Sequence, residues 1–413
     1  MAVIRPFKAL RPSKETAASV AALPYDVYSR QEAREKVKGD SLSFLRIDRP
    51  ETQFPEGYDI YAPEVYQKAD EMLRSMEEQG VFVQDEKPCY YIYELTMEGR
   101  AQTGLVAASS VDDYMNEVIR KHENTRKEKE EDRINHVNVC SAQTGPIFLA
   151  YRAREEVRNL ISRCKSQSPE VDFVSEDGIG HRVWVISSEE DICALTEAFA
   201  SMEHTYIADG HHRAASAVNV SLKRREATPG YTGEEEFNYF LSVLFPDDEL
   251  LILDYNRVLK DLKGMTEQEL LDRIAAVCEI EKAPESPWHP VEKGEMGFYL
   301  GGCWYRLTAK KEYMLEDPVE ALDVAFLQRE ILKPIWGIQD PKSDNRIDFV
   351  GGIRGLEELE RRCATDCAAA FSMYPTSIGE LFAVADAGLL MPPKSTWFEP
   401  KLRSGLFIHK IER

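Results

Sequence analysis

Apolar and polar residues alternate along the chain in short blocks, and their spacing changes between that of strands and that of helices. Two apolar runs, 89–95 and 102–108, are separated by a polar turn and predict a β-hairpin. The segment 63–79 is typical of a helix. Later strand-like runs are interleaved with helix-like ones without a detectable repeat, so the pattern predicts a mixed α/β fold of the α+β class.

The remaining elements follow from the same pattern. Strands are expected at 182–186, 205–208, 237–245, 250–255 and 381–385, and a hairpin with a Gly-Gly turn is expected over 297–307. Asp317 is a fitting N-cap, and Pro318 a fitting first residue, for a helix over 317–332. Another helix is expected over 356–370, where Cys363 and Cys367 would be buried free thiols on one face.

The length of 413 residues exceeds that of one usual domain. We expect three lobes, over residues 1–110, 111–260 and 261–413. No apolar run approaches the roughly 20 residues of a membrane helix, so no membrane partner is expected. The N-terminus lacks the build of a secretory signal and the eight scattered cysteines form no Cys-x-x-Cys pair, which together predict a cytoplasmic protein.

Charge narrows the choice of partner. The net charge is −21, whereas general nucleic-acid binding needs a basic surface, so nucleic acid is not expected as a partner. An anionic small molecule can approach such a chain only where fixed cations and N–H dipoles outweigh the global field, or where Mg²⁺ accompanies it. Phosphate binding by this chain therefore requires a dedicated site.

The stretch 205–217 carries the most chemistry. Its apolar start ends in Asp209-Gly210-His211-His212-Arg213 before an Ala-rich segment, which predicts a strand, a tight turn and a helix. The first N–H groups of such a helix favour an anion, and the imidazoles and the planar guanidinium add to that field. Gly210 lets the main chain approach a ligand closely. Alternatively, Asp209 is only an N-cap, the histidines are satisfied locally and the arginine lies at the surface.

The turn resembles a known signature. Residues 207–213 are similar to the phosphate-binding turn of the free serine kinases, small-molecule kinases of the ParB/sulfiredoxin-like superfamily. Two further segments match in the same order, 119–125 with its His-Glu pair and 391–396 with its Pro-Lys-Ser-Thr run. Over its whole length the chain resembles the family called domain of unknown function 1015 (DUF1015). The pieces that match that family are 23–27, 120–133, 144–147, the 209–213 turn and 394–402.

This resemblance implies a ParB/sulfiredoxin-like core, in the middle lobe, elaborated by large insertions and by an extra N-terminal lobe. It also implies roles for individual residues. Glu123 would be the base that accepts the hydroxyl proton, with Arg120 touching phosphate and His122 either touching phosphate or positioning Glu123. The alternative is that Glu123 is an exposed carboxylate of a charge-rich helical run. Asp209 is the competing base or a ligand of Mg²⁺. The turn Gly210–Arg213, with both of its histidines, would hold the nucleotide phosphates.

The C-terminal lobe is expected to contribute the substrate site. Lys394, Ser395 and Thr396 offer an ammonium and two hydroxyls, and Lys401 would assist them. A polar loop before a final strand is the alternative. An aromatic pair follows where the serine kinases have Arg and His, so part of their cationic clamp is missing or replaced. Sulfiredoxin has its cysteine nucleophile at the position of His211, so its redox chemistry does not carry over.

Two functional hypotheses result. The first is a nucleotide-dependent kinase that phosphorylates the hydroxyl of free L-serine or a similar metabolite, with ATP or ADP and Mg²⁺. The second is a non-catalytic, ParB-like nucleotide-binding regulatory protein. P-loop, dinucleotide-binding and His-Glu-x-x-His motifs are absent from the sequence. A homodimer is considered as a further prediction, and the polar loop 337–352 stays unassigned.

Overall fold

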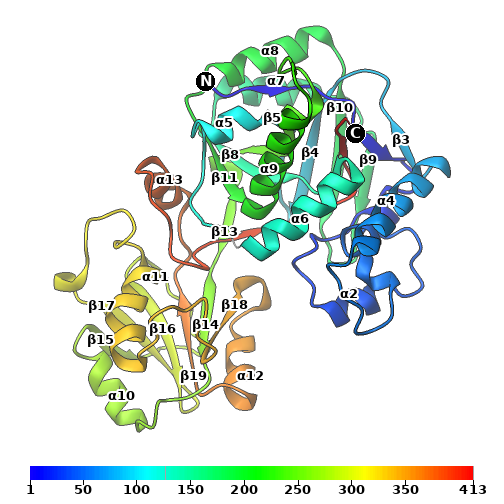
Figure 1. Ribbon diagram of the computed structural model, residues 1–413. Helices are drawn as coiled ribbons and strands as arrows, with labels where there is room; N and C mark the ends of the chain where they lie inside the picture. Colours follow the sequence, from blue (N-terminus) through cyan, green and yellow to red (C-terminus); the bar gives the residue numbers. More distant parts are fainter. Residues whose placement is uncertain (126, 413) are drawn as a thin grey trace. The chain divides into compact units, whose positions relative to one another are not determined.

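The computed structural model describes residues 1–125 and 127–412 and contains two compact units (Figure 1). The first unit comprises Met1–Leu250 together with Pro400–Arg413, and the second comprises Leu251–Glu399. The chain thus leaves the first unit once and returns to it at its C-terminus. This division differs from the three lobes expected from the sequence, because strands from both sides of residue 110 share one sheet.

The first unit is built around a nine-stranded sheet with the order β6-β11-β8-β12-β5-β4-β10-β9 and with β1 beside β5. The strands are β1 (Ile4–Arg5), β4 (Tyr90–Met97), β5 (Arg100–Ser110), β6 (Ile119–Arg120), β8 (Ile147–Tyr151), β9 (Val171–Val174), β10 (Gly180–Ile186), β11 (Thr205–Asp209) and β12 (Tyr239–Pro246). The predicted hairpin is confirmed as β4 and β5, which pair from Tyr91 opposite Val106 to Met97 opposite Arg100. The mixed α+β prediction is confirmed as well.

Three helices share one buried apolar core with this sheet. They are α7 (Glu155–Cys164), α8 (Glu189–Ala200) and α9 (His211–Ala227), all labelled in Figure 1. Leu195 and Phe199 of α8 and Ala214 of α9 are fully buried there together with Ile92 of β4. Because side chains alternate along a strand, the residues next to Ile92 point to the opposite face of the sheet.

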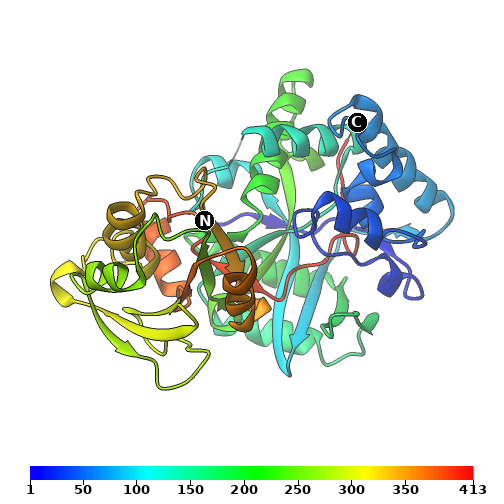
Figure 2. The ribbon, with the colours of Figure 1, turned by 90° about the horizontal axis from the view of Figure 1, so that it is seen from below.

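The C-terminal segment packs on that opposite face. Phe407 contacts Tyr91 and Tyr93, with ring centroids 5.4 and 5.8 Å apart. Figure 2 shows the red C-terminal segment running between the strands and the blue N-terminal elements, and isolated bridges join Leu10 to Ile408 and tie Ser404 to the N-terminal part. The last residues therefore complete the first unit.

The N-terminal elements form a second core, to which α6 (Lys127–Cys140) contributes Cys140 and the C-terminal segment contributes Ile408. The segment 63–79 is helical as predicted and forms α4. These elements are α1 (Ala17–Val20), α2 (Arg30–Lys36), α3 (Leu45–Asp48), α4 (Pro63–Glu78), β2 (Leu10–Pro12) and β3 (Phe82–Gln84); α5 (Val111–Met115), β7 (Ala142–Gln143) and β21 (His409–Lys410) complete the unit.

The second unit has its own six-stranded sheet with the order β15-β17-β16-β19-β14-β18. Its strands are β14 (Tyr255–Leu259), β15 (Cys278–Lys282), β16 (Glu295–Leu300), β17 (Cys303–Ala309), β18 (Ile347–Gly351) and β19 (Ala369–Met373), and its helices are α10 (Glu267–Ile274), α11 (Asp323–Phe326), a π-helix (Leu327–Trp336), α12 (Glu357–Thr365) and α13 (Ile378–Asp386). A short ribbon of β13 (Leu251–Leu253) and β20 (Trp397–Glu399) joins the two ends of the unit. The predicted Gly-Gly hairpin is confirmed as β16 and β17.

The strand predicted at 381–385 is wrong, because this segment lies inside α13. The side chain of Ser377 accepts a hydrogen bond from Glu380 N, and the Glu380 carboxylate accepts one from Ser377 N at 2.8 Å. This reciprocal capping box satisfies two N–H groups that would otherwise lack partners and fixes the start of a helix. The apolar run by itself fits a buried helix equally well.

Two predicted helices of the second unit have different bounds. Asp317 caps only an isolated turn, accepting from Val319 N at 2.9 Å, and the helix itself starts at Asp323. The helix predicted over 356–370 ends at Thr365, and β19 follows it. Cys363 and Cys367 are free thiols, but Cys367 lies beyond the end of that helix.

Candidate functional site

Sheet topology brings three distant segments to one edge of the first unit. Strands β6 and β11 are parallel, so the segments that follow them, with His122 and Gly210, leave the sheet at the same edge. Strand β8 runs antiparallel to β11, so the segment before it, Thr144–Pro146, lies at that edge too. The carboxyl ends of strands are a common place for ligand sites in such sheets. All three segments belong to the pieces that resemble the families named above.

The turn between β11 and α9 matches the predicted strand, turn and helix. Gly210 is the N-cap residue of α9 with φ +92°, a left-handed conformation that favours glycine, and no side chain of the described residues caps the helix. A Cβ on Gly210 would lie 3.1 to 3.2 Å from the Arg213 guanidinium. Asp209 is therefore not the N-cap; its Oδ1 accepts from Gly210 N at 2.7 Å. The helix start stays available to an anion.

Asp209 is ion-paired with Lys401, whose Nζ lies 3.0 Å from Asp209 Oδ2. Burial raises the pKa of Asp209, but the positive charges of Lys401 and Arg213 outweigh it and hold the pKa well below its ordinary value. Asp209 is thus a charged carboxylate and a weak base. Lys401, predicted to bind substrate, lies in the first unit and neutralises this carboxylate.

His122 and His211 form an edge-to-face pair with ring centroids 4.5 Å apart. Their exposed fractions are 3% and 7%, and His122 Nδ1 and His211 Nε2 are buried without a hydrogen-bond partner among residues 1–125 and 127–412. Burial lowers the pKa of His122 to about 4, and burial and the neighbouring His122 hold the pKa of His211 well below its ordinary value. Both imidazoles are therefore neutral near pH 7. They contribute hydrogen-bonding capacity to the site, and the expected positive charge comes from Arg213 and Lys401.

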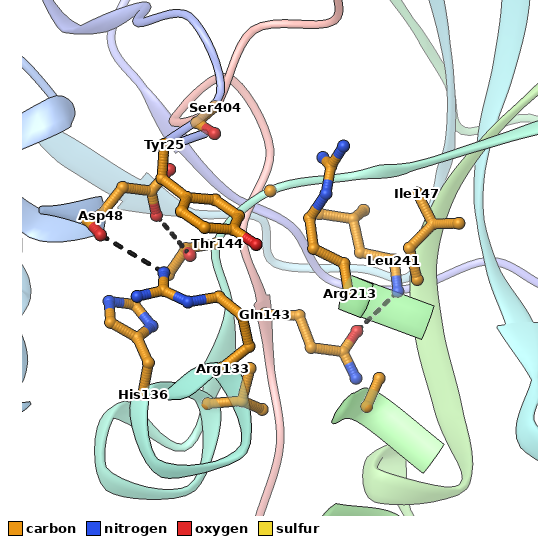
Figure 3. Close-up of a pocket in the computed structure, with 13 residues that line it drawn as sticks. Tyr25, Asp48, Arg133, His136, Gln143, Thr144, Ile147, Arg213, Leu241 and Ser404 are labelled. Carbon is orange, nitrogen blue, oxygen red and sulfur yellow. Dashed lines mark hydrogen bonds between the residues drawn. The ribbon is translucent and has the colours of Figure 1, made fainter. Parts of the chain in front are cut away.

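Arg213 enters a small pocket beside the turn, which we call the Arg213 pocket; its lining includes Tyr25, Arg133, Thr144 and Gly145 (Figure 3). Arg213 Nη1 donates to the carbonyl of Pro146 at 2.5 Å. A Cβ on Gly145 would lie 3.4 Å from Arg213 Nη1, so this glycine gives the guanidinium room. The volume of the pocket is about 30 Å³.

A second guanidinium faces the same pocket. The Arg133 guanidinium lies 4.2 Å from the ring centroid of Tyr25, and Figure 3 shows the Tyr25 hydroxyl directed toward the Arg213 side of the pocket. Arg133 Nη1 donates to the carbonyl of Asp48 at 3.3 Å, and Thr144 Oγ1 donates to Asp48 Oδ1 at 2.8 Å. Burial raises the pKa of Tyr25 to about 12, so its hydroxyl is a neutral donor. These contacts hold two arginines around one concave space.

Two predicted site residues lie at the end of β6 and just after it, Arg120 as the last residue of the strand and Glu123 beyond it. Arg120 Nη2 lies 3.3 Å from His204 Nε2, and its buried Nε has no partner within the described part of the chain. Glu123 is half-buried and directly follows His122. His212, the second residue of α9, is half-buried as well. The sheet edge therefore collects Glu123 with the histidine pair and the 209–213 turn.

The predicted substrate residues 394–396 lie in the second unit. Lys394 adopts φ +60°, is exposed, and places its ammonium 5.4 Å from the ring centroid of Tyr255. Its carbonyl accepts from Arg257 Nη2 at 3.0 Å. Ser395 is buried and donates to the carbonyl of Pro392 at 2.6 Å, so its hydroxyl stabilises the turn, whereas Thr396 is half-buried.

Three further residues that line the Arg213 pocket carry no individual catalytic or binding role predicted from the sequence. Tyr25, Arg133 and Thr144 lie in pieces that resemble the DUF1015 family, but the sequence shows nothing of their proximity. Within residues 1–125 and 127–412, no group of three or more His, Cys, Asp or Glu side chains is placed to hold a metal ion. No helix among the described residues has the length and apolar character that crossing a membrane requires.

Comparison with known proteins identifies a family. The family described as "Protein of unknown function (DUF1015)" matches residues 4–325. No curated protein matches the chain significantly.

Several solved structures resemble this one at low sequence identity. A free serine kinase variant in complex with ADP is 13% identical, with a TM-score of 0.36 over 76% of this chain and 93% of that chain. A C-terminally truncated SbnI from Staphylococcus aureus is 13% identical, with a TM-score of 0.38 over 74% and 87%. A conserved hypothetical protein from Pyrococcus furiosus is 14% identical, with a TM-score of 0.34 over 74% and 94%. At these scores the likeness carries no weight for the function, which has to come from the residues of this chain.

Proposed function

The chain belongs to this family, DUF1015, and we propose that it is a nucleotide-dependent small-molecule kinase. The acceptor is the hydroxyl of free L-serine or of a similar small metabolite, and the donor is ATP or ADP. The phosphates lie at the start of α9 against Gly210 and Arg213. Glu123 accepts the proton of the attacking hydroxyl.

One observation carries the proposal. Among the described residues, a helix start without a side-chain cap, a guanidinium that donates to the Pro146 carbonyl, and two buried imidazole nitrogens without hydrogen-bond partners lie around one sheet edge. Buried polar atoms without partners are rare and costly, and an anion with several oxygens would accept hydrogen bonds from the guanidinium, from the N–H groups of the helix start and from those imidazole nitrogens that carry a proton. A protein of net charge −21 has little other reason to concentrate donors at one place.

The transfer follows from these groups. The acceptor oxygen attacks the terminal phosphorus of the donor, a new P–O bond forms, and the bond from phosphorus to the bridging oxygen breaks. The products are the phosphomonoester and the nucleotide shortened by one phosphate, and the proton of the hydroxyl passes to the Glu123 carboxylate. Glu123 is preferred to Asp209 as the base, because the ion pair with Lys401 lowers the pKa of Asp209 and makes it a weak proton acceptor.

The turn offers one carboxylate to a Mg²⁺ ion. Mg²⁺ usually takes one or two protein carboxylates, with nucleotide phosphates and waters as its other ligands. Asp209 is the carboxylate at the turn that could serve, in agreement with the lack of a larger ligand cluster in the described part of the chain. When bound, Mg²⁺ would neutralise charge on the phosphates, and Lys401 would then separate from Asp209.

The test is direct. Purified protein is incubated with ATP or ADP, Mg²⁺ and L-serine, and O-phosphoserine is measured by mass spectrometry. Glu123→Gln should lower kcat by about a hundredfold or more, the usual contribution of a general base, while ATP affinity stays unchanged. Full turnover in this variant would assign the base elsewhere. Binding of ATP without turnover on a panel of hydroxy-amino acids would contradict the kinase and favour the ParB-like regulatory protein.

A further inference from the structure

A second cavity lies next to the Arg213 pocket. It shares Tyr25 and Arg133 with that pocket, and its lining adds Tyr28, Tyr61 and Tyr66, so we call it the tyrosine cavity. Its volume is about 220 Å³, compared with about 30 Å³ for the Arg213 pocket. A single water needs roughly 10–15 Å³ of such space, so the Arg213 pocket holds little more than two waters. Any larger part of a ligand has to lie outside the Arg213 pocket, and the tyrosine cavity adjoins it.

The walls of the tyrosine cavity suit a flat ring. Tyr61 is 55% exposed although it is a large aromatic residue, so about half of its surface is available to a ligand. Tyr66 also lines the cavity, and its ring is held in place because its hydroxyl donates to Asp132 at 3.0 Å. Ile60 and Val65 add apolar surface. Stacking on aromatic rings is how proteins commonly bind nucleobases.

The polar groups of the cavity suit a sugar and its phosphates. The carboxylate of Asp26 is exposed and can accept hydrogen bonds from ribose hydroxyls, whereas Glu51 is already paired with Arg49 Nε at 2.6 Å. The exposed Lys129 adds a cation. Arg133, paired with Asp132 at 2.8 Å, stands between this cavity and the Arg213 pocket. Lys129, Arg133 and Arg213 thus place positive charges from the tyrosine cavity to the Arg213 pocket.

We infer that the tyrosine cavity binds the base and ribose of the nucleotide donor, whose phosphates extend past Arg133 to Arg213 and the start of α9. This inference rests on the proposed function and adds the position of the nucleoside. A small amino acid is the less suitable occupant, because it has no ring to cover the face of Tyr61 and would leave most of the apolar wall exposed to water.

The experiment separates the base from the phosphates. Binding of ATP and of inorganic tripolyphosphate is measured by calorimetry for the wild type, Tyr61→Ala and Arg213→Ala. Tyr61→Ala should weaken ATP about tenfold, the usual effect of losing one stacking partner, and leave tripolyphosphate unchanged. Arg213→Ala should weaken both ligands. Tyr58→Ala is the matched control, because Tyr58 is also exposed, at 37%, but stacks on Phe54 and does not line the cavity.

Two results would overturn this inference and leave the proposed function standing. The first is unchanged ATP affinity in Tyr61→Ala and in the double variant Tyr28→Ala/Tyr61→Ala, with native circular dichroism in both. The second is a higher KM for the acceptor in Tyr61→Ala with unchanged ATP affinity, which would assign the cavity to the acceptor. If the wild type binds neither ATP nor tripolyphosphate, the proposed function fails and the inference fails with it.

Discussion

Two buried neutral imidazoles lie at the proposed anion site, and they should lower the stability of the folded protein at acidic pH. An anion is bound best by cations, yet His122 and His211 are kept uncharged by burial. A neutral imidazole has one N–H, and that of His122 donates to the Ile207 carbonyl, so His122 Nδ1 can donate to a phosphate oxygen only once the ring is protonated. The two neutral rings do not repel each other at a centroid distance of 4.5 Å. A bound phosphate would favour their protonation, so nucleotide binding should be coupled to proton uptake.

The pKa of His122 predicts an acid-sensitive stability. Its pKa is about 4 in the folded protein and about 6.5 in an unfolded chain, so the unfolded state binds more protons between these values. Folding stability therefore falls as the pH drops through 6.5, and this residue alone should cost about 2 kcal/mol between pH 7.5 and pH 5. This loss of stability is measured by urea unfolding of the wild type and of His122→Gln at both pH values.

The Gln variant should lose about 2 kcal/mol less than the wild type over this range, because it has no proton to gain. An equal loss in both proteins would show that His122 is protonated in the folded state. His136 and His181 also have lowered pKa values, but they are unchanged in the variant, so their contribution cancels in the difference. The pKa of His211, which His122 lowers, rises in the folded variant, and this change adds to the difference in the same direction.

At the residue scale, the part of the site that could be predicted from the sequence is the part whose residues are contiguous. Asp209-Gly210 and the residues after it are contiguous, and a positive-φ glycine before a helix has a recognisable pattern. The stack of Arg133 on Tyr25 could not be predicted, because the two residues are far apart in sequence and Arg133 lies in a charged run that is typical of a solvated helix. Burial of one arginine in such a run depends on tertiary packing.

At the scale of elements, the start of α9 combines a backbone requirement with a side-chain position. Gly210 has φ +92°, and its missing Cβ leaves space that the Arg213 guanidinium occupies. A substitution here should therefore have two separable effects, one on the stability of the fold and one on the position of Arg213.

Gly210→Ala should destabilise the first unit by about 1–2 kcal/mol through backbone strain. It should also weaken tripolyphosphate binding about tenfold, the equivalent of roughly one charge-assisted hydrogen bond. Gly233→Ala is the matched control, because Gly233 has φ +93° and nothing within 4 Å of its would-be Cβ. It should show a similar stability loss with unchanged affinity; weaker binding in Gly233→Ala as well would attribute the effect to general destabilisation.

The prediction of elements was wrong where the residues before a short apolar run determine whether it forms a helix or a strand. The run 381–385 was assigned to a strand, but the Ser377 and Glu380 capping box before it starts a helix. Asp317 and Pro318 are typical of a helix start, yet they form a separate turn before α11. The hairpin of β4 and β5 was predictable because its two runs are long, adjacent and separated by a turn.

At the scale of the whole molecule, the second unit is an insertion into the first. The chain leaves at Leu250 and returns at Pro400, and the residues next to these points, Leu251 and Glu399, are paired in β13 and β20. Opposed residues of an antiparallel pair lie only about 5 Å apart. A short link can therefore replace the whole second unit without stretching the first.

We expect a protein in which a Gly-Ser link joins Leu250 directly to Pro400 to fold cooperatively. It keeps the sheet, α9 and Lys401, and with them the Arg213 pocket and the tyrosine cavity, so its affinity for ATP should equal that of the full chain. Turnover should be lost if residues 394–396 orient the acceptor, since these residues are removed. Calorimetry with ATP and the O-phosphoserine assay measure the two outcomes separately. A folded product that no longer binds ATP would show that the second unit supplies part of the nucleotide site, and retained turnover would remove the substrate role from 394–396.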